Sequence, residues 1–162
     1  MFILILSKQK NKIYFLSEKI NKHHQNNFIE KDTFLKKYNL SGKKIISFFG
    51  QWDAARGLYP RESFLSQLNS PLFENSHDAF IKLKNITKDL EGFVLVFKPH
   101  PYDKFDYSSY EDDKTRILLK ENVHNILEIS EVVAVMLTTT QFEALLYEKP
   151  VLLLANSQLK GK

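Results

Sequence analysis

Two apolar segments in the second half of the sequence constrain the fold more than any other feature. Residues 93–97 read Phe-Val-Leu-Val-Phe and residues 132–137 read Val-Val-Ala-Val-Met-Leu. Continuous apolar runs rich in β-branched residues are typical of parallel strands buried on both faces. Each run stops at polar residues, Lys-Pro-His-Pro at 98–101 and three threonines at 138–140. Because ligands bind beyond the carboxyl ends of such strands, both polar segments are predicted to line a binding site.

The rest of the sequence predicts an alternation of helices and strands. We expect helices over 29–40, 76–90, 126–130 and 141–147, and strands over 44–49, 93–97, 132–137 and 151–154. Ser76 is predicted to cap the second helix, whose apolar stripe contains Phe80, Leu83, Ile86 and Leu90. Segment 102–113 is acidic and aromatic and is expected to be irregular. This alternation predicts the α/β class, with a doubly wound, Rossmann-like parallel sheet flanked by helices.

The length of 162 residues is enough for one domain with a core and small for two. We expect residues 29–162 to form that domain. Residues 1–28 are expected to be a linker or a remnant of a preceding domain, with short strands at 2–6 and 13–16. A polar link at 21–27 contains His23 and His24, which are predicted to lie in an exposed loop rather than to bind a metal.

Composition excludes several classes of protein. Cysteine is absent, so disulfides and thiolate metal sites are excluded, and we expect neither a metal nor a cofactor. The formal charge is +4, with lysines clustered in the first third. A solvated surface is the favoured explanation, and attraction to an anionic membrane face or a polyanionic substrate is the alternative. No recognition motif predicts nucleic-acid binding. No targeting signal or membrane-spanning run is evident, so a cytoplasmic location is expected.

The residues at the predicted strand ends can bind an anion. Prolines on both sides of His100 stiffen the backbone, and an imidazole can donate a hydrogen bond to a phosphate. The alternative is a turn histidine without a ligand. Thr138, Thr139 and Thr140 precede a helix, where hydroxyls and backbone N–H groups can bind an anion. Thr140 and Glu143 also have the spacing of a capping box, which needs no ligand; Glu143 is expected to cap the helix, to accept hydrogen bonds from a ribose, or to do both.

A third candidate segment follows the strand at 44–49. It contains Gln51, Trp52, Asp53 and Arg56, and it reads as a loop at a strand end. Two interpretations carry equal weight. Asp53 and Arg56 form a simple surface pair while Trp52 only packs, or the loop belongs to the binding site.

These motifs resemble the carboxyl-terminal domain of GT-B glycosyltransferases. The residues that carry the resemblance are Lys98-Pro99-His100-Pro101, Thr138-Thr139-Thr140 followed by Glu143-Ala144-Leu145, Lys149-Pro150-Val151 and Phe48-Phe49-Gly50-Gln51-Trp52-Asp53. The chain is most similar to the bacterial capsule polysaccharide biosynthesis and export group, which includes Kdo transferases. The resemblance covers residues 29–160 and implies one half of a GT-B fold.

The resemblance also implies site residues and partners. In related bacterial sialyltransferases a His-Pro motif and a Ser/Thr pair hold the nucleotide of a CMP-sugar. By that resemblance His100 contacts the CMP phosphate, and Thr139 and Thr140 replace the Ser/Thr pair. Gln51 stands where the capsule group often has a glutamine, and Lys98, Thr138, Glu143 and Asp53 complete the predicted substrate-binding set. The implied partners are a CMP-sugar and a polysaccharide or glycolipid acceptor, at the inner face of a bacterial membrane.

The sequence departs from this family in two respects. Its hydroxyl motif contains no serine, and it supplies one Rossmann-like domain where a GT-B enzyme needs two. The acceptor domain, which often carries the catalytic base, is therefore expected to lie elsewhere, and no catalytic residue is assigned. The sequence predicts a fragment, a split gene product or a decayed gene, inactive in transfer unless a partner chain supplies the other domain.

Three alternatives stay open. A teichoic-acid type polyol-phosphate transferase shares the fold and the Lys-Pro-His-Pro block, but such enzymes tend to have Asp-Tyr-Ser-Ser where this chain has Met-Leu-Thr-Thr at 136–139. A nucleotide-sugar epimerase is disfavoured because its glycine-rich loop before the helix is missing. A non-catalytic nucleotide-binding or docking module is the alternative from a different class.

Overall fold

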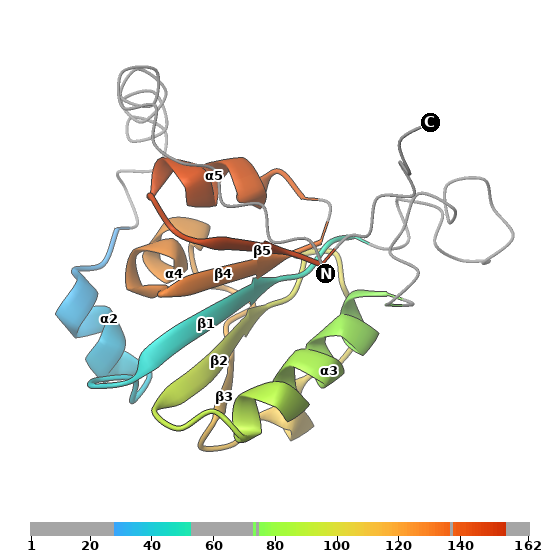
Figure 1. Cartoon of the computed structure of the whole chain (residues 1–162), viewed down its shortest axis with the longest axis horizontal. Coiled ribbons are helices and arrows are strands. Elements are labelled where there is room, and N and C mark those ends of the chain that lie inside the picture. The colour runs from blue at the N-terminus through green and yellow to red at the C-terminus, as the bar shows by residue number, and fades with distance from the viewer. Residues whose placement is uncertain (1–27, 53–72, 74, 137, 155–162) are drawn as a thin grey trace, which may run out of the picture.

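The computed structural model describes residues 28–52, 73, 75–136 and 138–154. In this part of the chain one parallel sheet has the strand order β3-β2-β1-β4-β5 (Figure 1). Its strands are β1 (Lys44–Phe49), β2 (Phe93–Lys98), β3 (Thr115–Ile117), β4 (Val132–Val135) and β5 (Val151–Leu153). The helices are α2 (Lys31–Lys37), α3 (Ser76–Lys88), α4 (Val123–Ile129) and α5 (Thr140–Leu146), with one 3-10 turn, η4 (Ser108–Tyr110). The predicted α/β, Rossmann-like class is confirmed.

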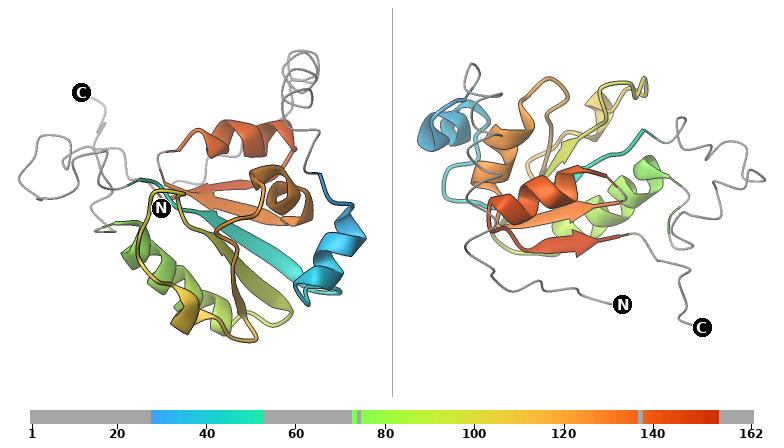
Figure 2. Two further views of the ribbon diagram at one scale, coloured as in Figure 1. Left: turned by 180° about the vertical axis from the view of Figure 1, so that it is seen from behind. Right: turned by 90° about the horizontal axis from the view of Figure 1, so that it is seen from above.

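Helices cover the sheet on both faces. Helices α2, α4 and α5 pack on one face and α3 packs on the other (Figures 1 and 2). Successive side chains of a strand point to opposite faces, so the neighbours Phe48 and Phe49 of β1 enter different layers. Because both layers are apolar, β2 and β4 have to be apolar at almost every position, which explains their continuous apolar runs.

Aromatic rings fill the layer between the sheet and α3. Phe97 of β2 is fully buried, and its ring centroid lies 5.1 Å from that of Phe48 and 4.4 Å from that of Phe80 of α3. Tyr107, in the segment after β2, meets the Phe97 ring edge-on with a centroid distance of 4.9 Å. This stack attaches α3 to the sheet near the carboxyl end of β2.

The opposite layer contains a buried polar link. Phe34 of α2 and Ala144 of α5 pack there against the apolar side chains of the strands. The hydroxyls of Ser47 in β1 and Ser130 after α4 lie 2.6 Å apart, and Ser130 donates to the carbonyl of Ile126. Since the Ser130 proton is used in that way, Ser47 donates to Ser130, and both buried hydroxyls are satisfied.

The start and the apolar face of α3 differ from the prediction. Asn75 has an extended φ of −165° and is the N-cap, because its Oδ1 accepts from the backbone N–H of Asp78 at 2.8 Å. The prediction of Ser76 as the cap is therefore wrong. The predicted stripe is also partly wrong, since Ile86 is 59% exposed while Phe80 and Leu83 are buried as expected. Thr87 continues the buried face instead, with its hydroxyl bonded to the carbonyl of Leu83.

The structure contains one strand, β3, that the sequence analysis did not predict, and one helix, α4, that starts earlier than predicted. Strand β3 was not predicted because its three residues, Thr-Arg-Ile, do not form an apolar run. It lies at the sheet edge and pairs with β2 alone. Helix α4 begins at Val123, three residues before the expected start, because Asn122 Oδ1 accepts from the N–H of His124. Segment 102–113 is irregular as expected, apart from the turn η4.

Several predictions lie outside the described residues. They are the strands at 2–6 and 13–16, the polar link at 21–27 and the pairing of Asp53 with Arg56. Within the described part of the chain, no helix has the length and apolar character required to cross a bilayer.

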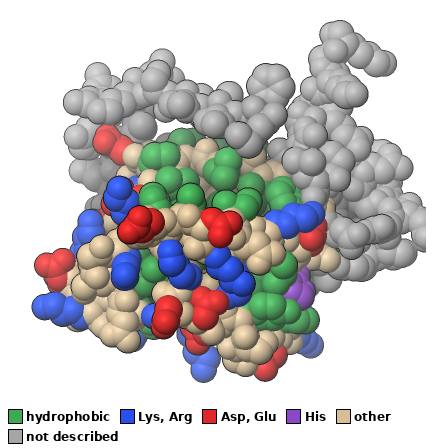
Figure 3. Space-filling model, turned by 60° about the horizontal axis from the view of Figure 1, so that its bottom comes forward, with side chains coloured by type: hydrophobic (Ala, Val, Ile, Leu, Met, Phe, Trp, Pro, Cys, Tyr) green, Lys and Arg blue, Asp and Glu red, His purple; other side chains and the backbone are tan. Residues whose placement is uncertain are grey.

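Charged side chains of both signs are mixed on the face that Figure 3 presents. Lysine and arginine side chains alternate there with aspartate and glutamate, and apolar side chains lie among them. On the surface of α3, Lys82 and Asp78 form an ion pair one turn apart at 2.9 Å. Mixed charge of this kind is typical of a solvated surface and not of a polyanion-binding patch.

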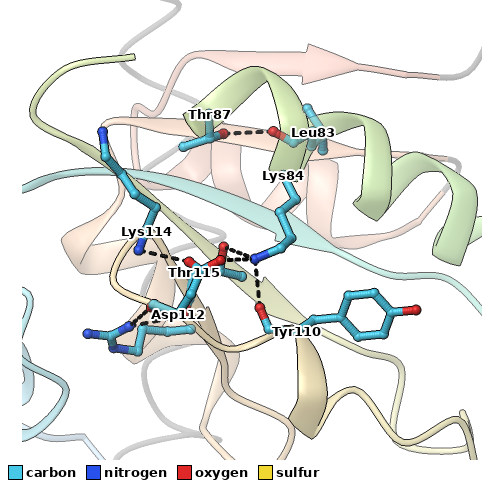
Figure 4. A network of polar contacts seen from close by, with 8 residues as sticks. Leu83, Lys84, Thr87, Tyr110, Asp112, Lys114 and Thr115 are labelled. Atoms are coloured by element: carbon cyan, nitrogen blue, oxygen red, sulfur yellow. Dashed lines mark hydrogen bonds and ion pairs between the residues drawn. The ribbon is translucent and has the colours of Figure 1, made fainter. Parts of the chain in front are cut away.

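Lys84 of α3 is the centre of a polar network that joins α3 to the segment before β3 (Figure 4). Its Nζ donates to the carbonyl of Tyr110 at 2.8 Å and lies 3.1 Å from the hydroxyl of Thr115. It also forms an ion pair with Asp112. The Lys84 side chain is only 11% exposed, so the three oxygens it bonds replace the water it loses.

Candidate functional site

The carboxyl ends of β1, β2 and β4 form the candidate site. Strand β1 is central, with β2 on one side and β4 on the other, so the chain order reverses between β1 and β4. Since every strand pairing is parallel, the segments that follow these three strands lie along one edge of the sheet. In open α/β sheets ligands bind beside such a reversal point.

Ser76 connects three of the elements at this edge. Its hydroxyl accepts a hydrogen bond from the backbone N–H of Gln51 at 3.0 Å. The same oxygen lies 3.3 Å from the Gln51 carbonyl and 3.9 Å from Met136 Sδ. A single buried hydroxyl therefore links the start of α3 to the segments after β1 and β4. Sequence reasoning missed this role because it assigned the hydroxyl to helix capping.

Gly50 brings the segment after β1 close to the His100 turn. Its N–H donates to the carbonyl of Lys98 at 2.9 Å. A Cβ atom at position 50 would lie 3.3 Å from Cε2 of Phe97 and 3.4 Å from the backbone nitrogen of His100. Because the Phe97 ring is held within the aromatic layer, a side chain at position 50 would force the ring or the His100 turn to shift by a few tenths of an ångström, so glycine is favoured here.

His100 is oriented by its own turn. The backbone N–H of Tyr102 donates to His100 Nδ1 at 3.2 Å, and the N–H of Asp103 donates to the His100 carbonyl at 2.8 Å. An Nδ1 atom that accepts a hydrogen bond carries no proton, so in the neutral ring the proton is on Nε2. This tautomer presents Nε2–H as the donor of the imidazole. Pro99 and Pro101 restrict the backbone on either side.

Lys98 lies farther along the edge, toward β3. It is 8% exposed, and its Nζ donates to the carbonyl of Leu119 at 2.9 Å. Burial lowers the pKa of Lys98, and the negative charge of Glu121 partly opposes that shift. The structure thus places the Lys98 ammonium on the backbone after β3, while its predicted contact with substrate stays a prediction.

Glu121 belongs to a neighbouring charged cluster. Burial favours a higher pKa for Glu121, but hydrogen bonds from Lys37 and Tyr38 outweigh it and lower the pKa. Lys37 Nζ lies 2.8 Å from the carboxylate. These contacts join α2 to the segment after β3, and they explain why Glu121 is ionised close to Lys98.

The threonines after β4 are positioned by a short turn. Thr138 Oγ1 accepts from the backbone N–H of Thr140 at 3.4 Å, and the same distance separates the two hydroxyls. Helix α5 begins at Thr140 and has Thr139 as its N-cap, whose side chain makes no capping bond. The predicted capping box with Thr140 as cap is therefore wrong. Thr139 is exposed, Thr138 is partly buried and Thr140 is buried.

The structure brings most of the predicted site residues to one edge of the sheet. Gln51, His100 and the threonines 138–140 follow the adjacent strands β1, β2 and β4, and Glu143 lies in the first turn of α5. Asp53 lies outside the described residues. The sequence analysis did not include Tyr102 in the site, although its backbone N–H orients His100. Its position two residues after His100 is a usable signal, since residues so close within a turn contact one another.

Comparison with solved structures finds the same fold within larger proteins. No protein-family model and no curated protein matches the sequence. Among solved structures, the chain is similar to KpsC of Thermosulfurimonas dismutans, a beta Kdo 2,7 transferase, with a TM-score of 0.53 and 20% identity over 94% of this chain. It is also similar to the wall teichoic acid polymerase TagF, with a TM-score of 0.51 and 22% identity over 91% of this chain.

These neighbours define the class of fold. The chain is a Rossmann-like unit that shares its fold with part of a Kdo transferase and part of a wall teichoic acid polymerase, so the predicted resemblance is confirmed for the fold. The chain spans 45% of the KpsC chain and 33% of the TagF chain. At identities of 20% and 22%, the TM-scores of 0.53 and 0.51 show a shared fold.

Proposed function

We propose that this chain is the donor-nucleotide-binding portion of a glycosyltransferase for capsular or surface polysaccharide synthesis, with a CMP-sugar as donor. One observation carries the proposal. His100 lies at the carboxyl end of β2, one strand away from the reversal between β1 and β4, and its Nδ1 accepts from the N–H of Tyr102. In the neutral ring this contact leaves the proton on Nε2, and the proposal assigns to that N–H the hydrogen bond to the nucleotide phosphate.

In this proposal the nucleotide phosphate lies between the His100 turn and the start of α5. His100 donates from Nε2, and the hydroxyls of Thr138 and Thr139 supply further donors. Hydrogen bonds to a charged oxygen are shorter and stronger than neutral ones. Donors fixed in position before the reaction also stabilise the charge that develops on a departing nucleotide. The polysaccharide or glycolipid acceptor is bound by a second unit outside the described residues, close to the membrane surface.

A second donor class shares this chemistry. The similarity to TagF favours a transferase of the teichoic-acid type, in which a polyol phosphate replaces the sugar. Both candidates use a nucleotide whose phosphate is held at the same sheet edge. A module that binds a nucleotide without turnover is the third possibility, and it shares the binding step.

Cytidine nucleotides are expected to bind in preference to others. The reason is the resemblance of the His-Pro and threonine segments to the nucleotide-binding residues of CMP-sugar enzymes. Isothermal calorimetry with CMP, UMP and GMP on the folded chain tests this expectation. Equal binding of the three nucleotides, or binding of none, contradicts the proposed donor.

His100 variants are expected to lose nucleotide affinity. His100→Ala removes a charge-assisted hydrogen bond and should weaken CMP binding by about 1.5–3 kcal/mol. His100→Asn is the matched control for the turn, because its amide oxygen can still accept from the N–H of Tyr102 although nothing replaces Nε2. We expect His100→Asn to lose CMP affinity as His100→Ala does, with an almost unchanged melting temperature. A large loss of stability with unchanged affinity would identify His100 as a structural turn residue.

A further inference from the structure

Three rings meet at the carboxyl ends of β1 and β2. The ring of Trp52 lies nearly parallel to that of His100, with an interplanar angle of 8° and a centroid distance of 6.0 Å. The ring of Tyr102 is tilted against both, 5.2 Å from Trp52 and 5.6 Å from His100. The segments after two adjacent strands thus form one aromatic group, which includes His100, the residue proposed to bind the phosphate.

This group is exposed to solvent, unlike the aromatic layer between the sheet and α3. Trp52 is 41% exposed and Tyr102 is 67% exposed, whereas Phe48, Phe80 and Phe97 are fully buried. A single exposed apolar side chain is ordinary in a soluble protein. Two exposed rings in mutual contact, at the edge where this fold binds ligands, indicate a ligand-binding surface more strongly than one exposed side chain does.

The chemistry of the group suits a nucleotide. Trp52 and Tyr102 offer flat π faces, and His100 next to them offers a donor for an anion. A nucleotide combines these two requirements in one molecule, since a ribose joins its flat base to its phosphate. Bases of every kind stack on aromatic side chains.

We propose that Trp52 and Tyr102 form the surface on which the base of the bound nucleotide stacks, while His100 holds its phosphate. This inference rests on the proposed function and extends it to the base. A sugar ring is the competing occupant of an aromatic surface, and it requires polar groups beside the rings for its hydroxyls. The carboxylate next to Tyr102, that of Asp103, already accepts from the N–H of Phe105 at 3.0 Å and from the hydroxyl of Tyr107 at 2.7 Å. We therefore assign the base, whose stacking needs only the π faces, to the described rings.

Stacking of a base on Trp52 can be followed by tryptophan fluorescence. Trp52 is the only tryptophan in the 162 residues, so the tryptophan fluorescence of the protein reports on this position alone. A base that stacks on the indole is expected to quench its emission. Ribose 5-phosphate and inorganic phosphate, which have no base, are expected to bind without comparable quenching.

The test compares CMP with ribose 5-phosphate on the wild-type chain and on two variants. Trp52→Ala should weaken CMP binding about tenfold, a typical loss for one stacked base. The affinity for ribose 5-phosphate, measured by competition against CMP, should stay unchanged. Trp52→Phe keeps an aromatic face and should retain most of the CMP affinity. Circular dichroism of each variant confirms that it is folded.

The outcomes separate this inference from the function on which it rests. If calorimetry detects no nucleotide binding to the wild-type chain, the proposed function fails and the inference fails with it. If CMP binds but Trp52→Ala leaves its affinity unchanged, only the inference is overturned. The inference is also overturned if Trp52→Ala weakens CMP and ribose 5-phosphate equally, because Trp52 then acts by positioning His100.

Discussion

Phe97→Ala is expected to lower the free energy of unfolding by about 3–5 kcal/mol, the cost of removing a fully buried phenylalanine ring. Phe97 lies between Phe48 and Phe80 in the layer that attaches α3 to the sheet. Its removal takes away the apolar surface that the ring buries and leaves a cavity that neighbouring rings fill only partly. Denaturation in urea, followed by circular dichroism, measures the loss.

The position of Phe97 explains why this loss should be large. The ring contacts α3 through Phe80 and the segment after β2 through Tyr107, and it lies where a Cβ atom at Gly50 would meet it. Paired aromatic rings contribute stability beyond the area they bury. A cavity here would therefore loosen three elements that meet near the His100 turn.

Phe142→Ala is the matched control for Phe97→Ala. Phe142 is 61% exposed on α5, so the same chemical change creates no cavity there and should alter stability by less than about 1 kcal/mol. Phe97→Leu, which keeps most of the volume, gives a measurement if Phe97→Ala does not fold. Equal losses for the variants at positions 97 and 142 would show that the aromatic layer is not a stabilising core.

The central strands were predictable from the sequence because their buried environment accepts mainly apolar residues. A strand covered on both faces has to be mostly apolar, and β2 and β4 satisfy that condition at almost every position. Strand β3 escaped prediction for the converse reason. At the edge of the sheet it needs only a few apolar side chains, and Arg116 bonds instead to the carbonyl of Tyr38 at 3.0 Å.

The location of the site was also predictable, because it follows from topology. Parallel strands end at one edge, so His100 and the threonines had to lie there once β2 and β4 were recognised. The contacts within the site were not predictable. The link from Ser76 to Gln51 joins residues 25 positions apart, and the packing of Trp52 on His100 depends on how two loops fold back. No local pattern encodes such pairs.

The second large effect is expected at Lys84. Lys84→Met should lower the free energy of unfolding by about 3 kcal/mol, because it leaves the carbonyl of Tyr110 and the hydroxyl of Thr115 without their charged partner. Lys82→Met is the matched control on the same helix. Lys82 is half exposed and pairs with Asp78 at the surface, so its loss should cost less than about 1 kcal/mol.

The effect of Lys84→Met should also depend on pH. Burial favours a higher pKa for Asp112, but the hydrogen bond and the charge of Lys84, with the N–H of Lys114, outweigh it and lower the pKa. A carboxyl whose pKa is lower in the folded protein stabilises the fold above its unfolded pKa, near about pH 4, and loses that contribution as the pH falls through the folded value. The stability difference between wild type and Lys84→Met should therefore be largest at neutral pH and shrink below about pH 4. Urea denaturation at a series of pH values measures it, and a difference that grows in acid would show that the Asp112 carboxylate is not the partner that Lys84 stabilises.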